Sequence, residues 1–86
     1  MPKAHPDAPT LALQAIVWIL SDLDRADRLI ATTGLTPDGM RARIAEPAVQ
    51  AAAIGFLCAH EPDLVACAEA LGVEPSTLAQ AGEALA

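Results

Sequence analysis

Apolar residues in this chain fall into blocks of helical length, and no stretch alternates apolar and polar residues with a period of two. The most apolar block runs from Pro47 to Ala59 and contains one polar side chain, Gln50. A helix that is apolar on every face must be covered by other helices or lie in lipid. This block has thirteen residues, whereas crossing a bilayer takes about 20. The pattern therefore predicts a central helix at residues 47–59 and no membrane span.

Start and stop signals divide the rest of the chain into short helices. Capping residues, prolines at the first helical position and left-handed glycines give these signals. The predicted starts are Thr10, Ser21, Thr36-Pro37, Glu46-Pro47, Glu61-Pro62 and Glu74-Pro75, and the predicted stops include Gly34 and Gly72. Because alanine favours helices and β-branched residues are sparse, the fold class is all-α. We predict a compact bundle of five to six short helices around residues 47–59.

Spacings of three and four residues predict which side of each helix faces the core. The expected inner residues are Leu13, Ile16, Val17 and Leu20; Leu23, Ala26 and Ile30; Met40 and Ile44; Leu64, Cys67, Ala68 and Leu71; and Leu78, Ala81 and Leu85. Asp24 and Arg28 are expected to pair on the outside of the second helix.

The central helix has one edge of small residues, Ala51, Gly55 and Ala59, spaced four apart. Such an edge lets a neighbouring helix approach closely, which would account for a helix-weakening glycine. We therefore expect Gly55→Leu to unfold the domain. Val49, Ile54, Phe56 and Leu57, on the other side, are expected to fill the core.

The 86 residues predict one domain, with a flexible arm at residues 1–9 and a single helical domain at residues 10–86. The apolar run at residues 11–20 resembles a signal-peptide core. However, Asp7 lies in the would-be basic region, and no small-residue cleavage site follows. A cytoplasmic location is therefore expected.

The net charge of −6 is unevenly distributed, because residues 44–86 contain six acidic residues and no Lys or Arg. Nucleic-acid binding is therefore not expected, since it depends on basic contacts to phosphate. Residues 29–44 and 67–81 nevertheless have the spacing of helix-turn-helix corners. The first contains Arg41 and Arg43, and the second presents no basic residue. A degenerate DNA-binding regulator is thus an alternative function.

No group of residues points to a cofactor, a metal or a catalytic site. Cys58, His60 and Cys67 are too few for the four ligands of a zinc site, and both cysteines are interpreted as buried thiols. No combination of nucleophile, base and orienting residue can be named. We therefore expect a protein that is not an enzyme, although an accessory subunit of an enzyme is a further alternative.

A non-enzymatic protein-interaction or adaptor domain is the main functional prediction. The first and fourth helices are apolar over more surface than a small domain easily buries, and excess apolar surface marks a protein partner or self-association, often a symmetric dimer. The other possibility is a tight core with no excess. The candidate interaction surface is Trp18, Arg25, Arg28, Arg41 and Arg43.

Several motifs resemble those of the DUF3572 family of small, uncharacterised alphaproteobacterial proteins. They are residues 15–24, Thr33-Gly34-Leu35-Thr36-Pro37 with Arg41, Glu46-Pro47 before an apolar helix, and His60-Glu61-Pro62-Asp63-Leu64. The resemblance spans most of residues 11–72. It implies a compact cytoplasmic all-α domain and supplies no activity, cofactor or catalytic residue.

Overall fold

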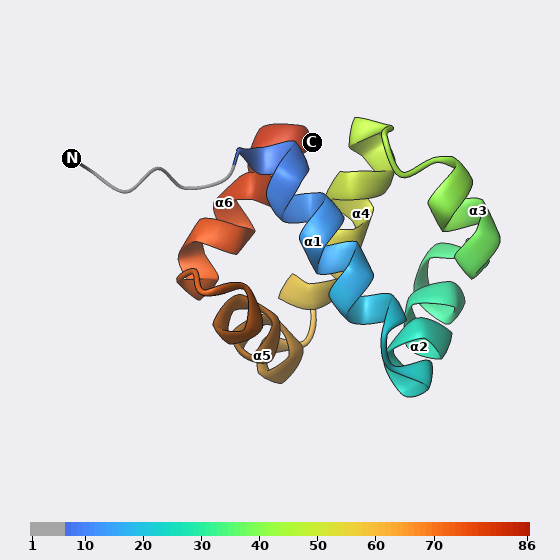
Figure 1. Cartoon of the computed structure of the whole chain (residues 1–86), viewed down its shortest axis with the longest axis horizontal. Helices are drawn as coiled ribbons and strands as arrows, with labels where there is room; N and C mark the ends of the chain where they lie inside the picture. Colours follow the sequence, from blue (N-terminus) through green and yellow to red (C-terminus); the bar gives the residue numbers. More distant parts are fainter. Residues whose placement is uncertain (1–6) are drawn as a thin grey trace.

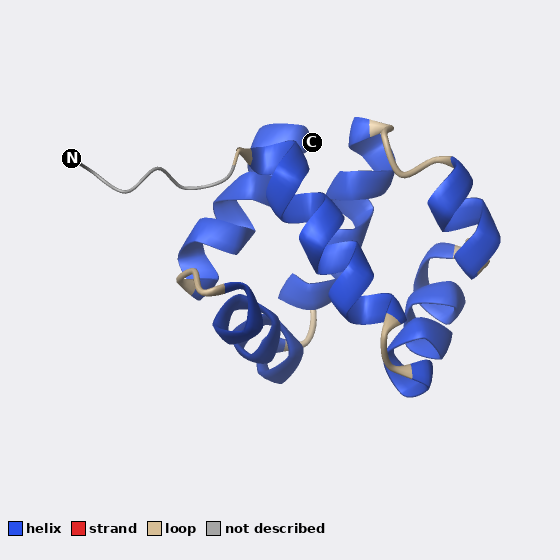
Figure 2. Cartoon of the chain, viewed as in Figure 1, coloured by secondary structure: helices blue, strands red, loops and turns tan. Residues whose placement is uncertain are grey.

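The computed structural model describes residues 7–86, which form six helices and no strand (Figures 1 and 2). The helices are α1 (Ala8–Leu20), α2 (Leu23–Thr33), α3 (Pro37–Ala42), α4 (Pro47–Cys58), α5 (Glu61–Leu71) and α6 (Pro75–Leu85). The predicted all-α class is confirmed, and α4 coincides with the predicted central helix.

Helices α1, α4 and α6 pack against one another at the centre of the molecule. In Figure 1, α1 crosses in front of α4, and the end of α6 lies beside the start of α1. Helix α5 packs against all three, on the α6 side. Helices α2 and α3 lie on the opposite side, where α2 contacts α1 and α4.

The core is made mostly of aliphatic side chains from these three central helices. Helix α4 contributes Val49, Ile54, Phe56 and Leu57, which are buried as predicted. Ala53 of the same helix is also buried. The one polar side chain of α4, Gln50, is also buried. The Nε2 of Gln50 donates a hydrogen bond to the carbonyl oxygen of Ile44 at 2.8 Å, so burial leaves its amide nitrogen with a partner.

The helix ends follow local sequence, with shifts of one to three residues at the first two starts. Gly34 and Gly72 adopt the left-handed conformation at φ +75° and +73°, as predicted. Asp7 and Asp22 are the N-caps of α1 and α2, in place of Thr10 and Ser21. Because α1 begins at Ala8, residues 8 and 9 belong to a helix and not to the flexible arm that was predicted at residues 1–9. Residues 1–6 of that arm lie outside the described residues.

The predicted inner faces of α1 and α2 are partly wrong. Leu13, Val17 and Leu23 were expected inside but are 37%, 65% and 82% exposed. The buried side of α1 is instead Leu11, Ala12, Ala15, Ile16 and Ile19, and α2 buries Leu29 beside Ala26. Helix α1 is apolar around most of its circumference, so residue spacing does not determine which side faces the core.

The close helix approach predicted at Gly55 occurs elsewhere. Gly55 is exposed, and a Cβ built on it would meet no atom within 4 Å. The expectation that Gly55→Leu unfolds the domain through a steric clash is therefore wrong. The tight contact lies between α6 and α4, where a Cβ on Gly82 would come within 2.7 Å of Ile54 Cγ2.

These two glycines give a matched test of the packing. Gly55→Ala should raise the free energy of unfolding by up to about 1 kcal/mol, because alanine favours the helix and the added methyl group meets no neighbour. Gly82→Ala should lower it despite the same gain in helix propensity, because the methyl group displaces the buried Ile54. Urea unfolding of both variants measures the two changes. A stabilised Gly82→Ala variant would contradict the observed contact.

Candidate interaction surface

The outward face of α1 carries no charged side chain. Residues Ala8–Leu20 contain no Asp, Glu, Lys or Arg, and Thr10, Leu13, Gln14 and Val17 are exposed. The outer face of a surface helix is normally rich in charged and polar residues. We define Leu13, Gln14 and Val17 as the α1 ridge, since they stand out from the domain on one side of the helix.

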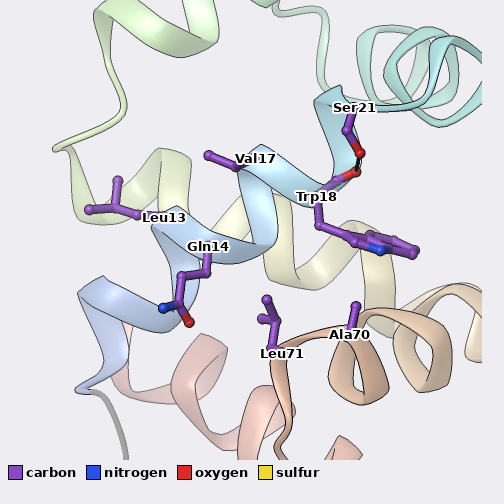
Figure 3. A pocket seen from close by; sticks show the side chains of 7 residues that line it. All are labelled: Leu13, Gln14, Val17, Trp18, Ser21, Ala70 and Leu71. Carbon is purple, nitrogen blue, oxygen red and sulfur yellow. Dashed lines mark hydrogen bonds between the residues drawn. The ribbon is translucent and has the colours of Figure 1, made fainter.

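A shallow groove of about 610 Å³ lies between the α1 ridge and the end of α5. In Figure 3, Gln14 and Trp18 point toward Ala70 and Leu71 of α5, while Val17 points away from them. The groove wall is mainly apolar, and its polar groups come from Gln14, Ser21 and Trp18.

A second groove, of about 410 Å³, lies on the other side of the ridge. It is lined by Ile16, Val17 and Leu20 of α1, with Ser21, Arg41 and Ile44. Val17 lines both grooves, so it projects between two hollows. This surface can bind through shape and apolar contact, which matches the way that helices pack ridges into grooves.

Arg25 and Trp18 lie together at the C-terminal end of α1. The guanidinium carbon of Arg25 is 3.7 Å from the centroid of the Trp18 ring, which is a close cation–π contact. The Nη2 of Arg25 donates to the carbonyl oxygen of Trp18 at 2.8 Å and to Ser21 Oγ at 3.3 Å. The cation therefore neutralises the negative end of the α1 dipole.

The other three candidate arginines each pair with a carboxylate. Arg28 contacts Asp63 at 2.7 Å, Arg41 contacts Asp38 at 3.2 Å, and Arg43 contacts Glu46 at 3.0 Å. Arg28 was expected to pair with Asp24, but it instead joins α2 to α5. The structure thus brings Trp18, Arg25 and Arg41 to the surroundings of the α1 ridge. Arg43 lines a separate hollow beside α4.

The two cysteines lie in different environments. Cys67 is fully buried, as predicted, whereas Cys58 is exposed, contrary to the prediction of two buried thiols. Burial raises the pKa of the Cys67 thiol to about 11. Burial and the nearby Glu83 carboxylate also raise the pKa of Cys58. Within residues 7–86, no three His, Cys, Asp or Glu side chains are grouped so as to hold a metal ion.

No single helix in the described part of the chain is both long and apolar enough to cross a membrane. Taken together, Pro47–Cys58 and Glu61–Leu71 reach the required length and composition, but the two helices are bent by 115° at the break between them.

Comparison with known families gives one match that covers nearly the whole chain. The family described as a protein of unknown function, DUF3572, matches residues 5–86. The chain belongs to the DUF3572 family. This match confirms the resemblance that the sequence motifs of this DUF3572 protein indicated. The comparison with curated proteins gave no match, and neither did the comparison with solved structures.

Sequence reasoning missed Leu13 and Val17 as surface residues of this DUF3572 chain, because both fit an inward stripe. The uncharged run from Ala8 to Leu20 was the signal that could have revealed them. A helix with no charged residue on the surface of a small domain must expose an uncharged face, whichever side turns inward.

The Arg28–Asp63 pair should make stability depend on pH. The hydrogen bond from Arg28 lowers the pKa of Asp63 below its ordinary value of 3.8. The stability that the ionised Asp63 contributes is therefore fully present above 3.8 and is lost as the pH falls through the lower folded-state pKa. Asp63→Asn should lower the free energy of unfolding at pH 7, and the difference from wild type should shrink as the pH falls below 3.8. Urea unfolding across this pH range measures the change. An unchanged difference at low pH would contradict the pairing.

The cysteine environments predict selective thiol modification. In the native protein at neutral pH, a small alkylating reagent should modify Cys58 and leave Cys67 unmodified, because Cys67 is fully buried and its pKa is raised to about 11. Mass spectrometry of digested protein should locate one label on Cys58. After unfolding in urea, both residues should be labelled. Equal labelling of both in the native state would contradict the buried position.

Proposed function

We propose that this DUF3572 protein is a non-enzymatic, cytoplasmic protein-interaction domain that binds its partner through the outward face of α1. One observation carries the proposal: an uncharged helix face exposes Val17 at 65% between two grooves. Contact with a partner would remove this apolar surface from water, which stabilises a complex.

Apolar burial at this face contributes to binding, although it does not by itself offset the cost of association. Covering the exposed parts of Leu13 and Val17 would contribute about 1 kcal/mol each, since both are already partly covered within the domain. The neighbouring Trp18 is half-buried and held in place by Arg25, so it offers a rigid aromatic surface beside the ridge. Rigid aromatic and arginine residues are the ones most often central to binding.

The arginine contacts support protein binding over the helix-turn-helix alternative. Arg28, Arg41 and Arg43 pair with carboxylates, which reduces the positive charge available to a phosphate backbone. At the second corner, α6 presents Ser76 and Gln80 near Glu74 and Glu83. The accessory-subunit alternative is the case in which the partner bound at α1 is an enzyme.

A matched pair of charge substitutions tests this proposal. Val17 and Val65 are both exposed valines, at 65% and 43%, but only Val17 lines the α1 grooves. Val17→Asp should abolish binding because it places a carboxylate in an apolar contact. Val65→Asp, with the same change of charge, should bind as wild type. Affinity capture from a lysate of the source cells, quantified by mass spectrometry, measures retention of the same partner proteins.

Circular dichroism should show that both variants keep the wild-type helical content, because both positions are exposed. Recovery of the same partners by wild type and Val17→Asp would contradict the assignment of the α1 face. If wild type, Val17→Asp and Val65→Asp all recover no protein above background, not even another copy of this chain, the result would count against an interaction domain.

A further inference from the structure

We infer that the partner bound at the α1 ridge is a second copy of this chain, in a two-fold dimer whose two α1 helices run antiparallel. This inference rests on the proposed function, since it names the occupant of the same surface. It is carried by two features of the described residues: the alternation of ridge and groove around Val17, and the opposite charges at the two ends of α1.

The shape of the surface is self-complementary. A two-fold interface brings the same patch of both subunits together, so that patch must supply both the projection and the hollow that receives it. Val17 projects between the α1–α5 groove and the groove beside Arg41. A second copy, turned by the two-fold axis, places its own Val17 in a groove of the first copy and receives the first Val17 in return.

The charges along α1 determine the direction of pairing. Asp7 lies at the N-terminal end, three residues before Thr10 on the exposed face, and Arg25 lies against Trp18 at the C-terminal end. No charged side chain lies on α1 between them. Helix α1 has thirteen residues, a length of about 20 Å. An antiparallel second copy therefore brings Asp7 of each chain toward Arg25 of the other.

An antiparallel second copy would also bring matching polar groups together at both ends of α1. When the helices cross between Gln14 and Val17, Thr10 of one copy lies opposite Ser21 of the other, and small polar groups meet there. Antiparallel helix dipoles also favour this arrangement over a parallel one. Repulsion between two copies of charge −6 is weakened by salt, because charges are screened beyond about 8 Å at physiological ionic strength.

Mass measurement over a range of concentrations tests the dimer. Sedimentation equilibrium of the full chain should show a single-chain mass at low concentration that rises to twice that value. Val17→Asp should raise the dissociation constant at least about ten-fold, as expected for a central interface residue. Val65→Asp should leave it within about two-fold of wild type, because exposed positions outside an interface contribute little.

Cross-linking tests the antiparallel arrangement independently. In a Cys58→Ala background, Gln14→Cys places a thiol near the two-fold axis, so a short bis-maleimide should join two chains. Gln80→Cys, which is exposed on α6, is the control and should give little cross-linked dimer. Addition of Val17→Asp to the Gln14→Cys chain should remove the cross-link.

Three results would overturn the inference: a wild-type chain that keeps the single-chain mass at every concentration, a Val17→Asp chain that dimerises as wild type does, or equal cross-linking from positions 14 and 80. A monomeric wild type whose capture of another protein still depends on Val17 would overturn the dimer and leave the proposed function standing. A monomer with no Val17-dependent partner would contradict both.

Discussion

The packing of α6 against α4 at Gly82 is the contact on which the rest of the structure depends. With no side chain on Gly82, the α6 backbone comes close to Ile54, and any Cβ there would overlap its Cγ2. Ile54 is fully enclosed by this approach. Since α1 packs against both α4 and α6, the position of α6 also determines where α1 lies.

Close packing of this kind accounts for the exposure of Leu13 and Val17 on α1. The side of α1 that meets α4 and α6 includes Ala12 and Ala15, which are completely buried. Small side chains allow helices to approach closely, and the chain has only two aromatic residues with which to fill wider gaps. With alanines turned inward, the helix geometry places Leu13 and Val17 on the outside. The exposed ridge is therefore a consequence of an alanine-rich core.

The helix number, the central helix and most helix ends could be predicted from the sequence because they depend on local chemistry. Gly34 and Gly72 stop helices through their own backbone freedom, and the Thr36 hydroxyl caps α3 by accepting a hydrogen bond from the Gly39 N–H three residues away. The orientation of α1 about its axis could not be predicted, because a helix that is apolar on most sides has no preferred inner face. The close helix approach expected at Gly55 was wrong for a similar reason, since α4 is apolar on nearly every side and its small residues do not show where a neighbour packs.

The Arg28–Asp63 pair could not be predicted from the sequence for a different reason. Its residues are 35 positions apart, so no periodicity relates them, whereas Asp24 offered a local alternative at the standard helical spacing. For the candidate surface, the sequence indicated Trp18, Arg25 and Arg41, but it did not indicate the uncharged ridge that lies beside them on α1. Apolar contact along such a ridge supplies affinity, and charges at its two ends supply orientation. In the proposed dimer, this arrangement would favour one direction of pairing over nonspecific apolar association.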